Sequence, residues 1–307
     1  MKVSIIGGGG RVGSNAAFAL QMGGVVKEIV IVDMNEDMAK GEALDLLHGA
    51  ALSSPQKIHA GGYDKVAGSD CVVITAGLRR KPDESRLELI NRNVALFKEI
   101  VASVKSAGLP NHATILVVSN PVDILTQLAV RDAGLPANQV LGLGTVLDTC
   151  RFRSLLADHF DVAATDVHAL ILGEHGDSMV PMWSSATVNG THISSLDGWS
   201  QEVGNSIFER TKKSGAEVIS LKGGAGWAVG VSIQVVVEAI ARNSEEMLPV
   251  SSLQTGAMGM KDVCLSLPTI VGSKGVHRVI EPACTEAEKS ALLASEAALK
   301  EVWEKVA

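Results

Sequence analysis

Short apolar runs alternate with helical patterns through the first half of the chain, and this alternation constrains the fold more than any other feature. The runs lie at residues 2–6, 28–32, 57–60, 71–75, 114–119 and 139–143. They are apolar on both faces, as strands buried within a parallel sheet are. Amphipathic segments separate them, at residues 12–22, 37–48, 87–107 and 122–133. This order predicts an α/β fold built on a doubly wound parallel sheet.

The second half of the chain has a different pattern. Helical segments are predicted at residues 145–160, 200–220, 227–243 and 285–306. Strand patterns occur at 166–172, 263–266 and 276–280, and a hairpin-like turn lies near Asn189 and Gly190. This mixture is typical of an α+β domain. We therefore expect two domains that pack tightly, residues 1–143 and residues 144–307.

Composition excludes several classes of protein. A net charge of −7 without a basic face argues against nucleic-acid binding. No apolar stretch reaches the 18 residues that a membrane span requires. The four cysteines are widely spaced and form no CxxC or Cys/His pair, so we expect neither disulfides nor a metal site. Lys2 leads directly into a strand without a signal peptide, and we expect a cytoplasmic protein.

A glycine-rich segment, GGGGRVG at residues 7–13, follows the first predicted strand and begins a helix. It matches GxGxxG from Gly8, and also a form one residue longer that uses Gly7; Gly10 and Gly13 belong to both. Glycines there permit a tight turn and a close approach of the backbone to a pyrophosphate at the helix N-terminus. The segment predicts a Rossmann-type dinucleotide site.

The identity of the dinucleotide follows from the end of the second predicted strand. Asp33 lies there, 20 residues after Gly13, where an acceptor for the ribose 2′-hydroxyl is expected. The next basic residue is Lys40. A carboxylate without a neighbouring cation would repel a 2′-phosphate, so the sequence favours NAD over NADP.

Four further segments carry a resemblance to a known family. They are residues 75–86 (TAGLRRKPDESR), 118–122 (VSNPV), 144–151 (GTVLDTCR) and 173–178 (GEHGDS). In this order behind the glycine segment, they resemble the lactate/malate dehydrogenase family over essentially the whole chain. The resemblance implies a catalytic second domain and reversible hydride transfer between NAD(H) and a small 2-hydroxy acid.

The resemblance also implies a group of catalytic residues. His175 would be the general acid and base, because imidazole changes charge near neutral pH. Asp148 would accept a hydrogen bond from His175 and fix its tautomer. Arg151, one helical turn further on, has a planar fork that suits a substrate carboxylate.

Arg86 would polarise the substrate carbonyl when its loop closes, and Asn120 would bond to the reacting oxygen. Besides Asp33, the expected cofactor contacts are Gly7, Gly8, Gly10, Arg11, Val12, Gly13, Thr75, Asn93, Val118 and Asn120.

Substrate choice depends on Arg80, six residues before Arg86. Malate dehydrogenases resemble this chain in carrying Arg there, and a guanidinium could pair with the second carboxylate of oxaloacetate. Met179 and Ala225 also resemble the malate form. These residues favour a malate dehydrogenase of the tricarboxylic acid cycle, acting on a 2-keto or 2-hydroxy dicarboxylic acid.

Alternatives remain open at this point. Residues 84–87 and 227–230 resemble lactate dehydrogenases, so the substrate could be lactate or another 2-hydroxy acid. An NAD- and metal-dependent glycosidase would need a Cys/His metal pair. A nucleotide sensor would not need Asp148, Arg151 and His175 together. The apolar pattern of residues 37–48 predicts a homo-oligomer, either a dimer or a tetramer.

Overall fold

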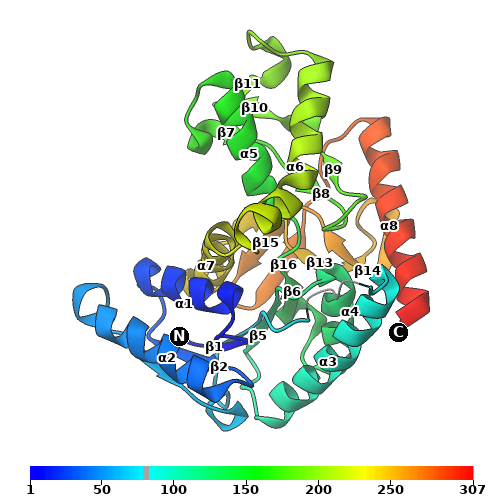
Figure 1. Cartoon of the computed structure of the whole chain (residues 1–307). Coiled ribbons are helices and arrows are strands. Elements are labelled where there is room, and N and C mark those ends of the chain that lie inside the picture. The colour runs from blue at the N-terminus through cyan, green and yellow to red at the C-terminus, as the bar shows by residue number, and fades with distance from the viewer. Residues whose placement is uncertain (79–82, 307) are drawn as a thin grey trace.

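The computed structural model describes residues 1–78 and 83–306 (Figure 1). The strands are β1 (Lys2–Ile6), β2 (Glu28–Val32), β3 (Lys57–Ala60), β4 (Cys71–Ile74), β5 (Thr114–Val117), β6 (Val140–Gly142), β7 (Val167–His168), β8 (Ile171–Leu172), β9 (Val180–Pro181), β10 (Thr187–Val188), β11 (Thr191–His192), β12 (Glu246–Leu248), β13 (Ser251–Thr255), β14 (Lys261–Ser266), β15 (Thr269–Gly272) and β16 (Gly275–Val279). The helices are α1 (Arg11–Gly23), α2 (Glu36–Gly49), α3 (Arg86–Ser106), α4 (Val122–Asp132), α5 (Val146–Phe160), α6 (Gln201–Lys222), α7 (Trp227–Arg242) and α8 (Glu286–Val306).

The largest sheet in the described part of the chain has eight strands in the order β14-β13-β6-β5-β4-β1-β2-β3. Strands β1 to β6 are parallel, and β13 joins β6 in antiparallel orientation through Ser251 and Gly142. The chain moves outward from β1 first to one side and then to the other. This is the doubly wound, Rossmann-type topology, and its switch point lies between β1 and β4.

Both faces of this sheet are covered, which explains why its strands are apolar on both sides. Ile5 faces the cluster that contains α1, α2 and α7, and the next residue, Ile6, faces the cluster that contains α3, α4 and α8. Figure 1 shows these two groups of helices on opposite sides of the sheet. Because successive side chains of a strand point to opposite faces, each strand contributes to both cores.

The second half forms an α+β region with a smaller core of its own. Phe152 and Leu156 of α5 pack there against Ile171 of β8 and Ile207 of α6. Met179, in the loop between β8 and β9, belongs to the same core. The rings of Phe152 and Trp183 meet edge to face, with centroids 4.9 Å apart. Strands β10 and β11 form the hairpin that the sequence predicts near Asn189.

The α/β fold class and the helix positions agree with the sequence prediction within two residues at each end. The strand predictions for the second half were incomplete. Residues 166–172, predicted as one strand, form two short strands, β7 and β8. No strand was predicted at β9, β12, β13 or β15, and β13 extends the large sheet. Among the helices in the described segments, none combines the length and the apolar character needed to cross a membrane.

Candidate active site

The turn after β1 is shaped by glycines that leave no room for side chains. Gly7 has φ +82°, and a Cβ there would lie 2.6 Å from Ala76 N. A Cβ on Gly13 would lie 2.4 Å from Gly7 O, and one on Gly8 would lie 2.6 Å from Ile31 Cγ2. The turn is thus packed tightly against β2, against the end of β4 and against the first turn of α1.

Helix α1 begins at this turn with Gly10 as its N-cap residue. Because Gly10 has no side chain, it leaves the first N–H groups of α1 without the cap that Ser or Asp would provide. Uncapped N–H groups and the positive end of a helix dipole suit a pyrophosphate. The residues present therefore fit the phosphates of a dinucleotide.

Asp33 lies directly after β2 and bounds the same turn. Its Oδ2 accepts a hydrogen bond from Gly9 N at 3.1 Å, and its Oδ1 accepts one from Asn35 N at 3.0 Å. The carboxylate is therefore fixed next to the glycine turn and stays partly exposed. This is the position that a ribose-binding carboxylate requires.

Two other predicted cofactor residues support the backbone around the turn. Thr75 Oγ1 donates to Ile6 O at 3.0 Å and to Gly7 O at 3.1 Å. Asn93 is buried, and its Oδ1 accepts from Leu78 N at 2.8 Å. Both side chains hold the end of β4 in place beside the glycine turn.

The aliphatic side chains of Val12 and Val118 pack against the core beneath α1. Arg11 bridges the two halves of the chain, because its Nη1 donates to Lys222 O at 2.6 Å and to Gly224 O at 2.9 Å. The start of α1 is thereby joined to the loop between α6 and α7.

The second group of predicted residues forms a charged cluster. His175 Nδ1 lies 2.5 Å from Asp148 Oδ2, and Arg151 Nη1 donates to Asp148 Oδ1 at 3.0 Å. Asp148 is 1% exposed, whereas the side chains of His175 and Arg151 are 21% and 17% exposed. Because Nδ1 faces Asp148, Nε2 is the nitrogen of His175 that can exchange a proton with a substrate.

The charges of this cluster shift the protonation of its members. Burial has the largest influence on the pKa of His175 and lowers it, but the charge and hydrogen bond of Asp148 outweigh burial and raise the pKa above its usual value. Burial likewise raises the pKa of Asp148, while His175 and Arg151 together hold it below its usual range. The pair therefore favours imidazolium beside carboxylate.

A series of contacts joins the glycine turn to the charged cluster along the carboxyl edge of the sheet. Thr75 bonds to Gly7, and Ser119 Oγ donates to Ala76 O at 2.6 Å. Four residues after Ser119, Asp123 Oδ2 accepts from His175 N at 2.8 Å. The fold thus brings residues 7, 75, 123, 148 and 175 to one region, where α/β sheets of this topology bind ligands.

Three predicted residues are placed less fully. Asn120 is exposed just before α4, and its Oδ1 accepts from Val122 N at 3.3 Å. Arg86 is the first residue of α3, of which the structure describes the backbone position only. Arg80 lies outside the described residues.

Comparison with known proteins agrees with this geometry. Residues 1–142 match the NAD binding domain of lactate/malate dehydrogenase, and residues 145–307 match its alpha/beta C-terminal domain. The chain belongs to the lactate/malate dehydrogenase family. It is therefore an NAD-dependent 2-hydroxy-acid dehydrogenase that acts on a small hydroxy or keto acid.

Individual members of this family that resemble the chain have lactate in their names. The chain is 45% identical to L-lactate dehydrogenase 1 of Clostridium acetobutylicum, over 98% of its length and 96% of that protein. It is 42% identical to the L-lactate dehydrogenase of Acetivibrio thermocellus, with the same coverage. The crystal structure of minor L-lactate dehydrogenase from Enterococcus mundtii superposes with a TM-score of 0.96 at 37% identity and covers 100% of this chain and 98% of that one.

These similarities overturn the prediction of a malate dehydrogenase, and with it the link to the tricarboxylic acid cycle. One physical reason is visible in the structure. Met179, which the malate hypothesis used, is 8% exposed and packs in the core with Phe152 and Ile171. Its identity therefore reflects packing in this core. A substrate assignment from three side chains was weaker than one from similarity along the whole chain.

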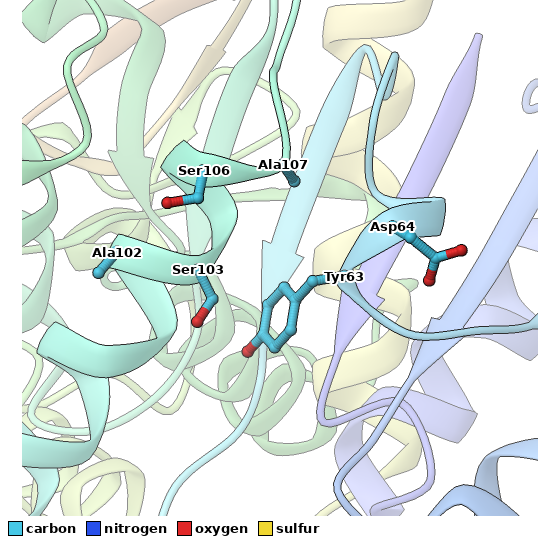
Figure 2. Close-up of a pocket in the computed structure, with 6 residues that line it drawn as sticks. All are labelled: Tyr63, Asp64, Ala102, Ser103, Ser106 and Ala107. Atoms are coloured by element: carbon cyan, nitrogen blue, oxygen red, sulfur yellow. The ribbon is translucent and has the colours of Figure 1, made fainter.

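Sequence reasoning missed one residue of this site. Asp123 has no motif of its own, but a carboxylate directly flanked by apolar residues (Val122, Ile124 and Leu125) was a signal that could have identified it. The six residues that line the pocket in Figure 2 belong to the turn after β3 and to the end of α3. None of them is a predicted site residue, and we assign this pocket no function.

Proposed function

We propose that the protein is an L-lactate dehydrogenase, which reduces pyruvate with NADH and oxidises L-lactate with NAD. The observation that carries this proposal is full-length similarity, at 40–45% identity, to proteins named L-lactate dehydrogenase. The bonded group of His175, Asp148 and Arg151 supports it, because these side chains supply an acid, its orienting carboxylate and a cation.

In the reducing direction, the imidazolium of His175 would donate a proton from Nε2 to the carbonyl oxygen of pyruvate. Asp148 would hold Nδ1–H and stabilise the charged ring before the transfer. In the oxidising direction, neutral His175 would remove the hydroxyl proton of lactate. When NADH is bound in the glycine turn, it supplies the hydride for C2.

The other side chains would position the substrate. Arg151 carries a guanidinium whose parallel N–H groups can hold the C1 carboxylate while one nitrogen remains bonded to Asp148. Asn120 and Arg86 are proposed to contact the carbonyl oxygen that gains charge, Arg86 from the N-terminus of α3. Gly7, Gly8, Gly10 and Gly13 would hold the phosphates of NAD, and Asp33 its ribose. The proposed division into domains remains at residues 143 and 144.

The direct test is kcat/KM with NADH for pyruvate and for oxaloacetate on the purified protein. We expect pyruvate to be favoured by about a hundredfold or more, which corresponds to about 2.7 kcal/mol in the transition state. A preference for oxaloacetate would overturn the proposal. Equal or higher activity with 2-oxobutyrate would assign the enzyme to longer 2-hydroxy acids.

We also propose that the protein is a homo-oligomer, in which α1 and α2 take part in the interface. Phe18 and Met22 of α1 are 48% and 61% exposed, and Leu44 and Leu47 of α2 are 53% and 45% exposed. Each helix thus exposes two large apolar side chains about one turn apart, and such side chains suit burial in a protein interface. Light scattering should give a dimer or a tetramer, and a monomer at micromolar concentration would contradict the proposal. The expected location is the cytoplasm.

A further inference from the structure

A second carboxylate lies beside the catalytic histidine. Asp123 is in the first turn of α4 and is 2% exposed. Its Oδ2 accepts a hydrogen bond from the backbone N–H of His175 at 2.8 Å, across 52 residues of sequence. His175 is thus held by two buried carboxylates, Asp148 at its ring and Asp123 at its backbone N–H.

The second oxygen of the Asp123 carboxylate, Oδ1, accepts no hydrogen bond from the described residues. Within residues 1–78 and 83–306, neither Oδ1 of Asp123 nor the buried hydroxyl of Ser251 meets the geometry of a hydrogen bond, although the hydroxyl lies close enough to lower the pKa of the carboxyl. If Asp123 only anchored the loop of His175, one neutral acceptor oxygen would be enough, and the amide of Asn would supply it. A charged carboxylate costs more free energy to bury than an amide does. The charge itself therefore requires an explanation.

The charges around these two groups come from several elements. Burial has the largest single influence on the pKa of His175 and lowers it. The negative charges of Asp148 on α5 and Asp123 on α4 raise this pKa, and the positive charge of Arg151 on α5 lowers it. Burial raises the pKa of Asp123 to about 6, Ser251 and His175 lower it, and Glu174 raises it. Burial raises the pKa of the Cys264 thiol on β14, and the charge of Asp123 raises it further.

We propose that Asp123 is a positioning residue of the reaction: its carboxylate anchors the loop that carries His175, and its negative charge helps Asp148 to keep the imidazole protonated for reduction. The inference rests on the proposed function. It extends the acid and base machinery from one carboxylate to two. With a pKa of about 6, most of the Asp123 carboxyl is ionised at neutral and higher pH, where a histidine with a raised pKa loses its proton.

The decisive variant is Asp123→Asn, which keeps an oxygen acceptor for His175 N–H and removes the charge. Loss of the charge should lower the pKa that governs turnover, by roughly one unit, which is the lower end of the shift that a nearby opposite charge produces. At a pH above that pKa, kcat/KM for pyruvate should then fall about tenfold, because only the protonated histidine donates. Between pH 6 and that pKa, where Asp123 is ionised in the wild-type protein, kcat/KM for lactate should rise, since oxidation needs the neutral form. Below pH 6 the profiles of the two proteins should converge.

The opposite changes in the two directions distinguish this role from a purely structural one. If Asp123→Asn lowers both directions equally at every pH, or if its pH profiles coincide with those of the wild-type protein, the proposal is wrong. NADH affinity and the melting temperature, measured on the same sample, report whether the fold is intact.

A second variant keeps the test valid if Asp123→Asn does not fold. Asp123→Ser also removes the charge and leaves a smaller polar side chain beside the backbone N–H of His175. It should lower the pKa that governs turnover in the same direction, and an unchanged pH profile in this variant would overturn the proposal. The matched control is Asp132→Asn at the other end of α4, where the carboxylate pairs with Arg131 and the profile should not move.

Failure of the proposed function is distinguishable from failure of this inference. If the wild-type protein does not reduce pyruvate, the proposed function is wrong. The pH profiles are then measured with the 2-keto acid that the protein does reduce. If the wild-type protein reduces pyruvate but the variants have unchanged pH midpoints, only the proposed role of Asp123 is wrong.

Discussion

The glycine turn and the charged cluster lie at the same edge of the sheet but are built in different ways. The turn is made of backbone: a Cβ added to Gly7 or Gly13 would lie within 3 Å of main-chain atoms of Ala76 or of the turn itself. The cluster is made of side chains, and Asp148 and His175 are 27 residues apart. Damage to the turn should therefore change cofactor binding, and damage to the cluster should change turnover.

The largest expected effect is on turnover. His175→Asn removes the proton donor, and kcat should fall about a thousandfold, within the range of general acid catalysis. The Kd for NADH, measured by fluorescence, should change less than about threefold, because the hydrogen bonds of His175 to described residues go to Asp148 and Asp123 and not to the glycine turn. Loss of NADH binding in this variant would show that the two regions are not separable.

Arg151→Lys keeps a positive charge in the cluster but removes the planar fork. We expect kcat/KM for pyruvate to fall about ten- to a hundredfold, the cost of one charge-assisted hydrogen bond. The Asp148 carboxylate can still pair with the ammonium group, so the melting temperature should change little. Unchanged kinetics would mean that another cation holds the substrate carboxylate.

Gly13→Ala tests the turn. The added methyl group would lie 2.4 Å from Gly7 O, so the turn must shift, and overpacking of this kind costs about 1–3 kcal/mol. We expect weaker NADH binding by about tenfold and little change in kcat at saturating NADH.

Gly41→Ala is the matched control for this variant. Gly41 lies within α2, and nothing is within 4 Å of the position that its Cβ would take. Alanine should therefore leave NADH binding unchanged and stabilise the helix by about 0.5–1 kcal/mol. If Gly13→Ala proved as harmless to NADH binding as Gly41→Ala, the close packing described for the turn would be contradicted.

The smallest effect concerns stability and pH. The pKa of His175 is raised in the folded protein, so its contribution to stability is complete below the unfolded value and is lost as the pH rises through the folded value. The difference in melting temperature between the wild-type protein and His175→Asn should therefore be larger at pH 6 than at pH 9. A difference that does not vary with pH would show that the pair with Asp148 adds no stability through the charge.

Predictions from sequence were most accurate where contacts are local. The strand, turn, helix and second strand between residues 2 and 33 follow one another directly, so spacing alone predicted both the glycine turn and the place of Asp33. The predictions failed where remote segments meet. Strand β13 pairs with β6, which lies more than 100 residues away in the sequence, and no local sequence pattern predicted this pairing.

By itself, the sequence determined the fold class, the dinucleotide turn and the residues of the charged cluster, because periodicity, glycine geometry and motif order are properties of short segments. Only the tertiary structure decided that Met179 is a core residue and that Asp123 binds the backbone of His175. Both depend on which side chains lie together after burial, and burial is a property of the whole packed chain. Substrate choice was misjudged from Arg80 for a related reason: the preference of a site arises from all the groups that surround the substrate.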